Sequence, residues 1–157
     1  MHHLFWLRRQ LICGRSGPDR DPWKPKELAS AGITAVLSVN DAALVHPEDF
    51  AAVGIRHRCI PLSDSAPPLD GDLDVCRAAL PECWQFVSEQ LTAGGCVMIH
   101  CSSGKDRTGL FLAYYLCRAE AFSPADAIGE VRRVRPIALT AVGWEEFALS
   151  VLEACNA

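Results

Sequence analysis

The feature that most constrains the fold is a short apolar run that leads through a polar loop into a long apolar segment. Residues 96–99 (Cys-Val-Met-Ile) are uniformly apolar, as expected for a strand that is buried on both faces of a sheet. Residues 108–119 are apolar on nearly all sides of a helix, which predicts a buried helix. The polar loop of residues 100–107 must therefore connect the carboxyl end of a strand to the amino end of a helix.

The rest of the chain alternates between strand-like and helix-like patterns. Residues 33–39 form a β-branched and apolar run, and residues 55–62 alternate partially between apolar and polar residues, so both segments predict strands. Residues 14–25 and 63–71 are typical of loops. Pro81 lies inside a helical pattern and predicts a kink or a break. The predicted helices cover residues 25–28, 47–53, 73–91, 124–134 and 140–155. This alternation predicts an α/β fold with a small central sheet flanked by helices.

Length and composition narrow the class of protein. A chain of 157 residues with 50% apolar and 22% charged residues can bury one substantial core, so we expect a single domain over residues 1–157. The net charge of −4 argues against nucleic acid or an anionic membrane surface as a partner. The longest apolar stretch, residues 110–116, is too short to span a bilayer, and Arg8 and Arg9 interrupt the apolar amino terminus. We therefore expect a cytoplasmic protein without a membrane span.

The chain contains eight cysteines, and one of them stands apart. No two form a Cys-x-x-Cys pair, so a zinc site has no support, and we expect neither a metal nor another cofactor. Cys96 and Cys117 lie in apolar runs, where cysteine usually acts as a small hydrophobic residue. Reduced thiols are expected because no secretory signal is evident. Cys101 alone lies in the polar loop between the strand and the helix.

The composition of this loop points to phosphate chemistry. Backbone N–H groups between a strand end and a helix start converge on one point and form a nest for a tetrahedral oxyanion. Gly104 allows the loop to wrap tightly, and the planar guanidinium of Arg107 can hold two phosphate oxygens. Cys101 would lie at the floor of this positive cup, where the thiolate is favoured and is placed for in-line attack on phosphorus. Thr108 can donate a hydrogen bond to the sulfur when the phosphocysteine is hydrolysed.

Other polar residues near the cysteine have alternative interpretations. His100 either hydrogen-bonds around Cys101 and fixes its orientation, or is a structural histidine beside an apolar strand. Lys105 and Asp106 do not by themselves select a substrate. The arginines of residues 132–135 form either a phosphate-facing patch or the solvated face of a helix. The residues expected to surround the phosphate are Ser102, Ser103, Gly104, Lys105, Asp106 and Arg107.

Residues 99–109, Ile-His-Cys-Ser-Ser-Gly-Lys-Asp-Arg-Thr-Gly, resemble the H-C-x5-R-[S/T] signature of cysteine-dependent protein tyrosine and dual-specificity phosphatases. The order of elements is also similar to that of a small atypical dual-specificity phosphatase, and residues 31–39 and 127–136 are similar to segments of that family. The resemblance implies a dual-specificity phosphatase-like fold. It also implies hydrolysis of phosphate monoesters through a phosphocysteine intermediate in a phosphate-binding loop (P-loop).

The resemblance further implies a general acid, an aspartate on a loop upstream of the cysteine that protonates the leaving oxygen and then activates water. Asp64 is favoured because it follows the predicted strand at residues 55–62 and precedes two prolines, as in the acid loop of small dual-specificity phosphatases. A loop aspartate can instead cap the next helix, and this interpretation suits Asp72 better. The four candidates are Asp64, Asp70, Asp72 and Asp74.

Three functions stay open at this level. The leading one is a phosphatase that acts on phosphorylated proteins or small phosphomonoesters. The second keeps the mechanism but acts on a phosphoinositide or inositol phosphate, with Lys105 adding positive charge. The third is a catalytically silent phosphate-binding module, which is disfavoured because a nucleophile, an arginine, a hydroxyl and a candidate acid are all present. The physiological substrate, the oligomeric state and redox regulation by a second cysteine are left open by the sequence.

Overall fold

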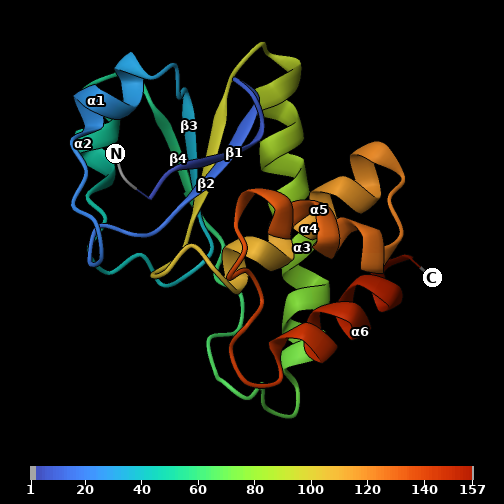
Figure 1. Cartoon of the computed structure of the whole chain (residues 1–157). Helices are drawn as coiled ribbons and strands as arrows, with labels where there is room; N and C mark the ends of the chain where they lie inside the picture. The colour runs from blue at the N-terminus through green and yellow to red at the C-terminus, as the bar shows by residue number, and fades with distance from the viewer. Residues whose placement is uncertain (1–2, 157) are drawn as a thin grey trace.

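Five short strands form one mixed sheet in the order β1-β2-β5-β3-β4 (Figure 1). Strand β2 pairs in parallel with β5, β5 with β3, and β3 with β4, whereas β1 pairs antiparallel with β2. The carboxyl ends of the four parallel strands therefore lie at the same edge of the sheet, at its lower end in Figure 1. The computed structural model describes residues 3–156, and its strands are β1 (Phe5–Arg8), β2 (Ile12–Arg15), β3 (Ala35–Ser38), β4 (Arg56–Cys59) and β5 (Val97–His100).

Helices cover both faces of the sheet (Figure 1). One face carries α1 (Pro25–Ser30) and α2 (Pro47–Ala51), and the other carries α3 (Asp72–Thr92), α4 (Arg107–Glu120), α5 (Pro124–Val134) and α6 (Trp144–Asn156). Each face of the sheet has its own hydrophobic core, and successive residues of β3 point to opposite faces. Ala35 and Leu37 pack in the core on the side of α3 to α6. Val36 packs with Leu28 and Phe50 in the core on the side of α1 and α2. The predicted α/β fold with a small central sheet flanked by helices is confirmed. No helix within residues 3–156 is long and apolar enough to cross a membrane.

The segment predicted as strand, polar loop and buried helix has that structure. All four residues of β5 are buried, and the loop that follows β5 ends where α4 begins at Arg107. The next helix also starts as predicted: the Ser123 hydroxyl accepts a hydrogen bond from the N–H of Asp126 at 3.2 Å. Contiguous sequence signals were sufficient for this half of the fold.

The amino-terminal hairpin was not predicted, and the interpretation of residues 14–25 as a loop is wrong for Gly14 and Arg15. Both belong to β2, which is buried along its whole length. A side chain at Gly14 would overlap the ring of Phe5 on β1, so the glycine lets the two strands pack closely. The guanidinium of Arg15 lies 2.9 Å from the carboxylate of Asp21, which compensates its buried charge. Contacts with Phe5 and Asp21 thus stabilise β2, although the residues of β2 do not by themselves predict a strand.

Two helix predictions also need correction. The break predicted at Pro81 does not occur, because α3 is one helix from Asp72 to Thr92. Pro81 lies on the exposed face, where the carbonyl that loses its N–H donor can bond to water. The last helix begins at Trp144 rather than at Thr140. The Thr140 hydroxyl instead donates to the carbonyl of Ile137 at 2.6 Å and holds a turn in the loop between α5 and α6.

Candidate active site

Loops that follow the four parallel strands enclose a cavity of about 270 Å³ at the carboxyl edge of the sheet. Each of the four loops contributes to its wall, which is how this topology assembles a site from distant parts of the chain. The lining residues are Pro18 and Asp19 after β2, Asn40, Asp41, Ala42, Ala43 and Leu44 after β3, Asp64 after β4, and Ser102 and Arg107 after β5. The cavity therefore brings the predicted Arg107 together with the predicted acid, Asp64.

Cys101 lies at the base of the loop between β5 and α4, with only 2% of its surface exposed. The Thr108 hydroxyl donates a hydrogen bond to its sulfur at 3.0 Å. Gly104 has φ +62°, and a Cβ there would lie 2.6 Å from the backbone of Arg15, so only glycine fits the turn of this loop. The first turn of α4 thus places the Thr108 hydroxyl beside the thiol, and N–H groups at the start of a helix favour a bound anion.

A second loop, which follows β2, braces the phosphate loop. The N–H of Gly17 donates to the carbonyl of Ser102 at 2.8 Å, and the Ser102 hydroxyl donates to the Asp19 carboxylate at 2.5 Å. Arg20 donates more weakly to the same hydroxyl, at 3.5 Å. The Ser102 side chain and carbonyl are therefore held by the neighbouring loop.

The arginines of residues 132–135 have three different environments. Arg132 donates to the carbonyl of Ala138 and forms an ion pair with Glu145 at 2.6 Å, and Arg133 is exposed. Arg135 instead donates to the carbonyls of Ser103 at 2.6 Å and Gly104 at 3.3 Å. Burial lowers the pKa of Arg135, and the nearby Cys101 opposes that shift. Arg135 thus supports the phosphate loop by neutralising its carbonyls, while Arg133 fits the predicted solvated face.

The side chains of Lys105 and Asp106 point to the loop between α5 and α6. The Lys105 ammonium donates to the Thr140 hydroxyl at 3.2 Å and lies 3.6 Å from the Asp106 carboxylate. Asp106 also accepts a hydrogen bond from the N–H of Ala141 at 3.3 Å. Neither side chain lines the cavity, so contact of these residues with a phosphate stays a prediction that would rest on their backbone N–H groups.

His100 is fully buried behind Cys101. Its Nδ1 lies 3.3 Å from the Cys101 carbonyl oxygen, and its Nε2 lies 2.6 Å from the hydroxyl of Ser38 on the neighbouring strand β3. Desolvation lowers the pKa of His100 to about 4, so the ring is neutral near pH 7. Of the two interpretations from the sequence, the contact with Cys101 favours the orienting one.

Asp64 is exposed on the loop that follows β4, and its neighbours hold that loop against α6. The Trp144 indole donates to the carbonyl of Ser65 at 3.0 Å. Asp72 is the first residue of α3 and accepts a hydrogen bond from the N–H of Leu69 at 2.7 Å, so it stabilises the turn before the helix. Asp64 is the one of the four candidate acids that lines the cavity.

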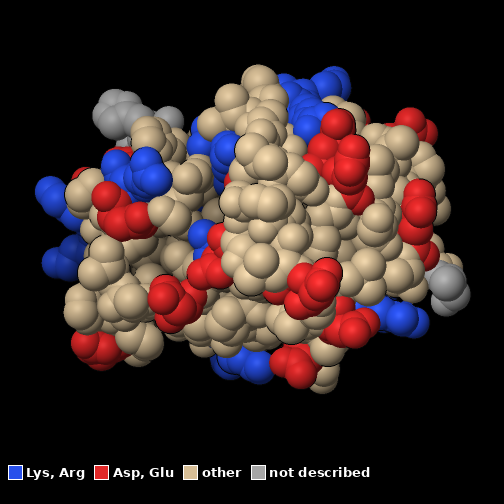
Figure 2. All heavy atoms as spheres, turned by 90° about the horizontal axis from the view of Figure 1, so that it is seen from below, with Lys and Arg blue, Asp and Glu red and all other residues tan. Residues whose placement is uncertain are grey.

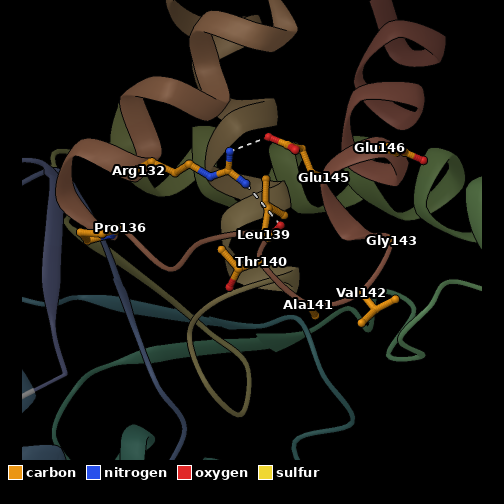
Figure 3. Close-up of a pocket in the computed structure, with 9 residues that line it drawn as sticks. All are labelled: Arg132, Pro136, Leu139, Thr140, Ala141, Val142, Gly143, Glu145 and Glu146. Atoms are coloured by element: carbon orange, nitrogen blue, oxygen red, sulfur yellow. Dashed lines mark hydrogen bonds and ion pairs between the residues drawn. The ribbon is translucent and has the colours of Figure 1, made fainter.

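A larger cavity, about 640 Å³, lies between α5 and α6 rather than over Cys101 (Figure 3). The ion pair of Arg132 with Glu145 crosses it, and Val142 points away from that pair in Figure 3. It contains none of the residues predicted to perform the chemistry. Within residues 3–156, no cluster of three or more His, Cys, Asp or Glu side chains is arranged to hold a metal ion.

Comparison with known proteins identifies the family. Residues 1–144 match the family model described as "PTP-SAK: Swiss Army Knife protein, DSP-PTPase phosphatase domain". The chain belongs to this DSP-PTPase family. The match covers every loop that lines the cavity, together with the start of α6.

Similar curated proteins carry phosphatase names. The chain is 28% identical over 118 residues to the Arabidopsis thaliana dual specificity protein phosphatase 1, covering 74% of this chain and 54% of that protein. It is 27% identical over 129 residues to the human dual specificity protein phosphatase 22, covering 82% of this chain and 64% of that protein. It is 25% identical over 124 residues to the Arabidopsis thaliana phosphatidylglycerophosphate phosphatase PTPMT1, covering 76% of this chain and 34% of that protein. The chain thus spans about one third to two thirds of the length of these relatives.

Solved structures of the DSP-PTPase fold superimpose over nearly the whole chain. Tk-PTP in its active form has a TM-score of 0.77 at 22% identity and covers 98% of this chain and 96% of its own. PTPMT1 in complex with PI(5)P has a TM-score of 0.73 at 16% identity, with 94% and 93% covered. These similarities independently support the fold.

Several residues of this DSP-PTPase site were not found from the sequence. Asp19, Ser38 and His57 contact the phosphate loop or the residues behind it. Arg135, which the sequence offered only as one of three arginines in a candidate phosphate-facing patch, donates to the Ser103 carbonyl. A usable signal existed for Ser38, because a polar residue within a predicted buried strand needs a partner. No local signal separated Arg135 from the arginines beside it.

Proposed function

We propose that this chain is a cysteine-dependent phosphatase that hydrolyses phosphate monoesters, with Cys101 as the nucleophile. The observation that carries the proposal is the contact of the Thr108 hydroxyl with the Cys101 sulfur, 3.0 Å apart at the amino end of α4. That hydrogen bond supports Cys101 as the nucleophile, and Arg107 and Asp64 line the cavity at the same edge of the sheet. Membership of the DSP-PTPase family supports the same chemistry.

In the first step, the Cys101 thiolate attacks phosphorus while the bond to the leaving oxygen breaks. Asp64 gives its proton to that oxygen, so the alcohol or phenol leaves neutral and Cys101 carries the phosphoryl group. Arg107 and the backbone N–H groups of the loop stabilise the charge on the three equatorial oxygens.

In the second step, water attacks the phosphocysteine and the phosphorus–sulfur bond breaks. Asp64, now a carboxylate, takes a proton from the water, which returns the acid to its starting state. The Thr108 hydroxyl stabilises the departing thiolate through the hydrogen bond seen at 3.0 Å. The products are inorganic phosphate and the free enzyme.

The charges around the cavity favour a substrate with one phosphate, such as phosphotyrosine in a protein. Asp19, Asp41 and Asp64 line the cavity, and Arg107 is the one basic residue among its described lining residues. In the view from below, acidic side chains are spread over this face, and basic side chains gather mainly toward its margins (Figure 2). A headgroup with several phosphates would be repelled by these carboxylates.

A lipid or inositol phosphate is the second candidate. It is favoured by the similarity to a phosphatidylglycerophosphate phosphatase and to a structure described as a complex with PI(5)P. It is opposed by the position of Lys105, whose ammonium bonds to Thr140 and Asp106 outside the cavity.

The test is turnover of an aryl phosphate by the wild-type chain and by Cys101→Ser. We expect wild-type turnover in the presence of EDTA, no turnover by Cys101→Ser, and retained binding of vanadate by the variant. An active Cys101→Ser variant, or loss of wild-type activity on chelation, would contradict the mechanism. Lack of wild-type turnover with intact vanadate binding would instead identify the silent phosphate-binding module.

The substrate class needs a separate comparison. A phosphotyrosine peptide and a soluble short-chain phosphoinositide should be assayed at the same ionic strength and pH. We expect the larger kcat/KM for the peptide. A clear preference for the phosphoinositide would replace this substrate class and leave the assignment of Cys101 intact.

A further inference from the structure

Three polar side chains from neighbouring strands form a chain of hydrogen bonds that ends at Cys101. The Nε2 atom of His57 on β4 lies 2.8 Å from the Ser38 hydroxyl on β3, which lies 2.6 Å from Nε2 of His100 on β5. The Nδ1 atom of His100 lies 3.3 Å from the carbonyl oxygen of Cys101. Ser38 and His100 are fully buried, whereas His57 is partly exposed. The chain of bonds thus links the partly exposed His57 to the first residue of the phosphate loop.

The available protons permit only one direction for these bonds. A carbonyl oxygen only accepts, so the bond to Cys101 requires the proton of the neutral His100 ring to be on Nδ1. The Nε2 atom of His100 then accepts, and the Ser38 hydroxyl must donate its single proton to it. That proton is no longer available to His57, so His57 must donate from Nε2 to the Ser38 oxygen. Each donor therefore depends on the one before it.

Aromatic rings pack against both histidines. The ring of Trp23 contacts the His100 ring edge-on with centroids 4.8 Å apart, and the ring of Phe50 lies 5.6 Å from that of His57. The titratable groups that act electrostatically on His100 are His57 on β4, Arg15 on β2 and Asp19 in the loop after β2. Desolvation lowers the pKa of His57, and both its Nε2–H tautomer and its protonated form can donate to Ser38.

We propose that Ser38 and His57 are positioning residues for the nucleophile, because they keep His100 in the tautomer that donates to the Cys101 carbonyl. This bond orients the first peptide group of the phosphate loop and reduces the negative potential of its carbonyl beside the thiolate. The inference rests on the proposed function, since it assigns Cys101 as the nucleophile. The hydrogen-bond chain itself is a structural property, and it can be tested without turnover.

Histidine tautomers are read directly from imidazole ¹⁵N chemical shifts. In the wild-type chain near pH 7, His100 should carry its proton on Nδ1, and His57 should carry a proton on Nε2. In His57→Leu, no donor faces the Ser38 oxygen, so the Ser38 hydroxyl can either donate to Nε2 of His100 or accept from it. The Nδ1–H form of His100 should therefore lose population. A wild-type His100 protonated on Nε2 would overturn the proposal, whether or not the chain is a phosphatase.

The catalytic consequence is tested with matched variants. His57→Gln places an amide N–H near the position of Nε2 and is the control that should keep the bond, whereas His57→Leu and Ser38→Ala remove it. The readouts are kcat and KM for an aryl phosphate, and the pH midpoint of inactivation by iodoacetamide over about pH 5 to 8.

We expect His57→Leu and Ser38→Ala to raise that pH midpoint by about half a unit to one unit and to lower kcat about tenfold, with KM changed less than about twofold. His57→Gln should stay near the wild-type values. The proposal would be overturned if His57→Leu and Ser38→Ala kept the pH midpoint and the kcat of the wild type. It would also be overturned if His57→Gln and His57→Leu lost the same fraction of kcat. Absence of Cys101-dependent turnover in the wild-type chain would instead contradict the proposed function. The His100 and His57 tautomers would still show whether the proposed chain of hydrogen bonds exists.

Discussion

Acidification should destabilise this protein through one buried histidine. Burial lowers the pKa of His100 from 6.5 to about 4 in the folded chain. Because the folded pKa lies below the unfolded one, the unfolded state binds a proton that the folded state does not bind between these two values. The free energy of unfolding should therefore be unaffected by His100 above about pH 7 and should fall as the pH drops from 6.5 toward 4.

The size of the effect follows from the difference between the two pKa values. A shift of one unit corresponds to about 1.4 kcal/mol, so this single group should contribute a loss of about 3 kcal/mol by pH 4. That is a large part of the 5–15 kcal/mol that is typical of a whole domain. His57 should add to the loss in the same direction, because desolvation lowers its pKa as well.

The assay is urea unfolding followed by tryptophan fluorescence at several values between about pH 7.5 and pH 4.5. The wild-type chain is compared with His100→Gln, which cannot titrate in this range. The variant should be less stable at neutral pH but should lose distinctly less stability on acidification, because carboxylate effects are common to both chains. His46→Gln, which changes a histidine side chain with 67% exposure, is the control and should behave like the wild type. Equal pH dependence in the wild type and in His100→Gln would refute the reasoning.

Three further predictions concern the cavity and the loops around it. Arg107→Lys should lower kcat/KM for an aryl phosphate about 100-fold or more, because lysine lacks the bidentate fork of arginine. Lys105→Ala should lower kcat/KM less than about threefold. Similar losses in the two variants would mean that the phosphate-binding cation is misassigned. Asp64→Asn should lower kcat about 100-fold for phenyl phosphate but less than about tenfold for a highly activated aryl phosphate, and it should remove the alkaline limb of the pH–rate profile. Trp144→Phe, which loses the 3.0 Å bond to the Ser65 carbonyl but keeps an aromatic ring, should reproduce that leaving-group dependence in weaker form; an alkaline limb that persists in Asp64→Asn would exclude Asp64 as the acid.

The sequence by itself determined the parts of this protein whose chemistry is contiguous. Cys101, Gly104, Arg107 and Thr108 lie within one turn-and-helix segment, so their spacing already implied a nest at the amino end of a helix. The α/β class followed from the alternation of strand and helix patterns, since each pattern depends on the side-chain period within one element. Asp64 could be favoured because its position relative to the preceding strand is also a local property.

Only the tertiary structure decided which distant residues meet around that segment. Pairing of β3 with β5 aligns Ser38 with His100, and pairing of β3 with β4 brings His57 within 2.8 Å of the Ser38 hydroxyl, although His57 and His100 are 19 and 62 residues from Ser38 in the chain. Arg135 was indistinguishable from its neighbours in sequence, yet the docking of its segment against the phosphate loop gives it the Ser103 carbonyl as a partner. Hydrogen bonds and packing between such segments depend on the order of strands in the sheet. That order is set by the burial of the whole core rather than by the residues of any one element.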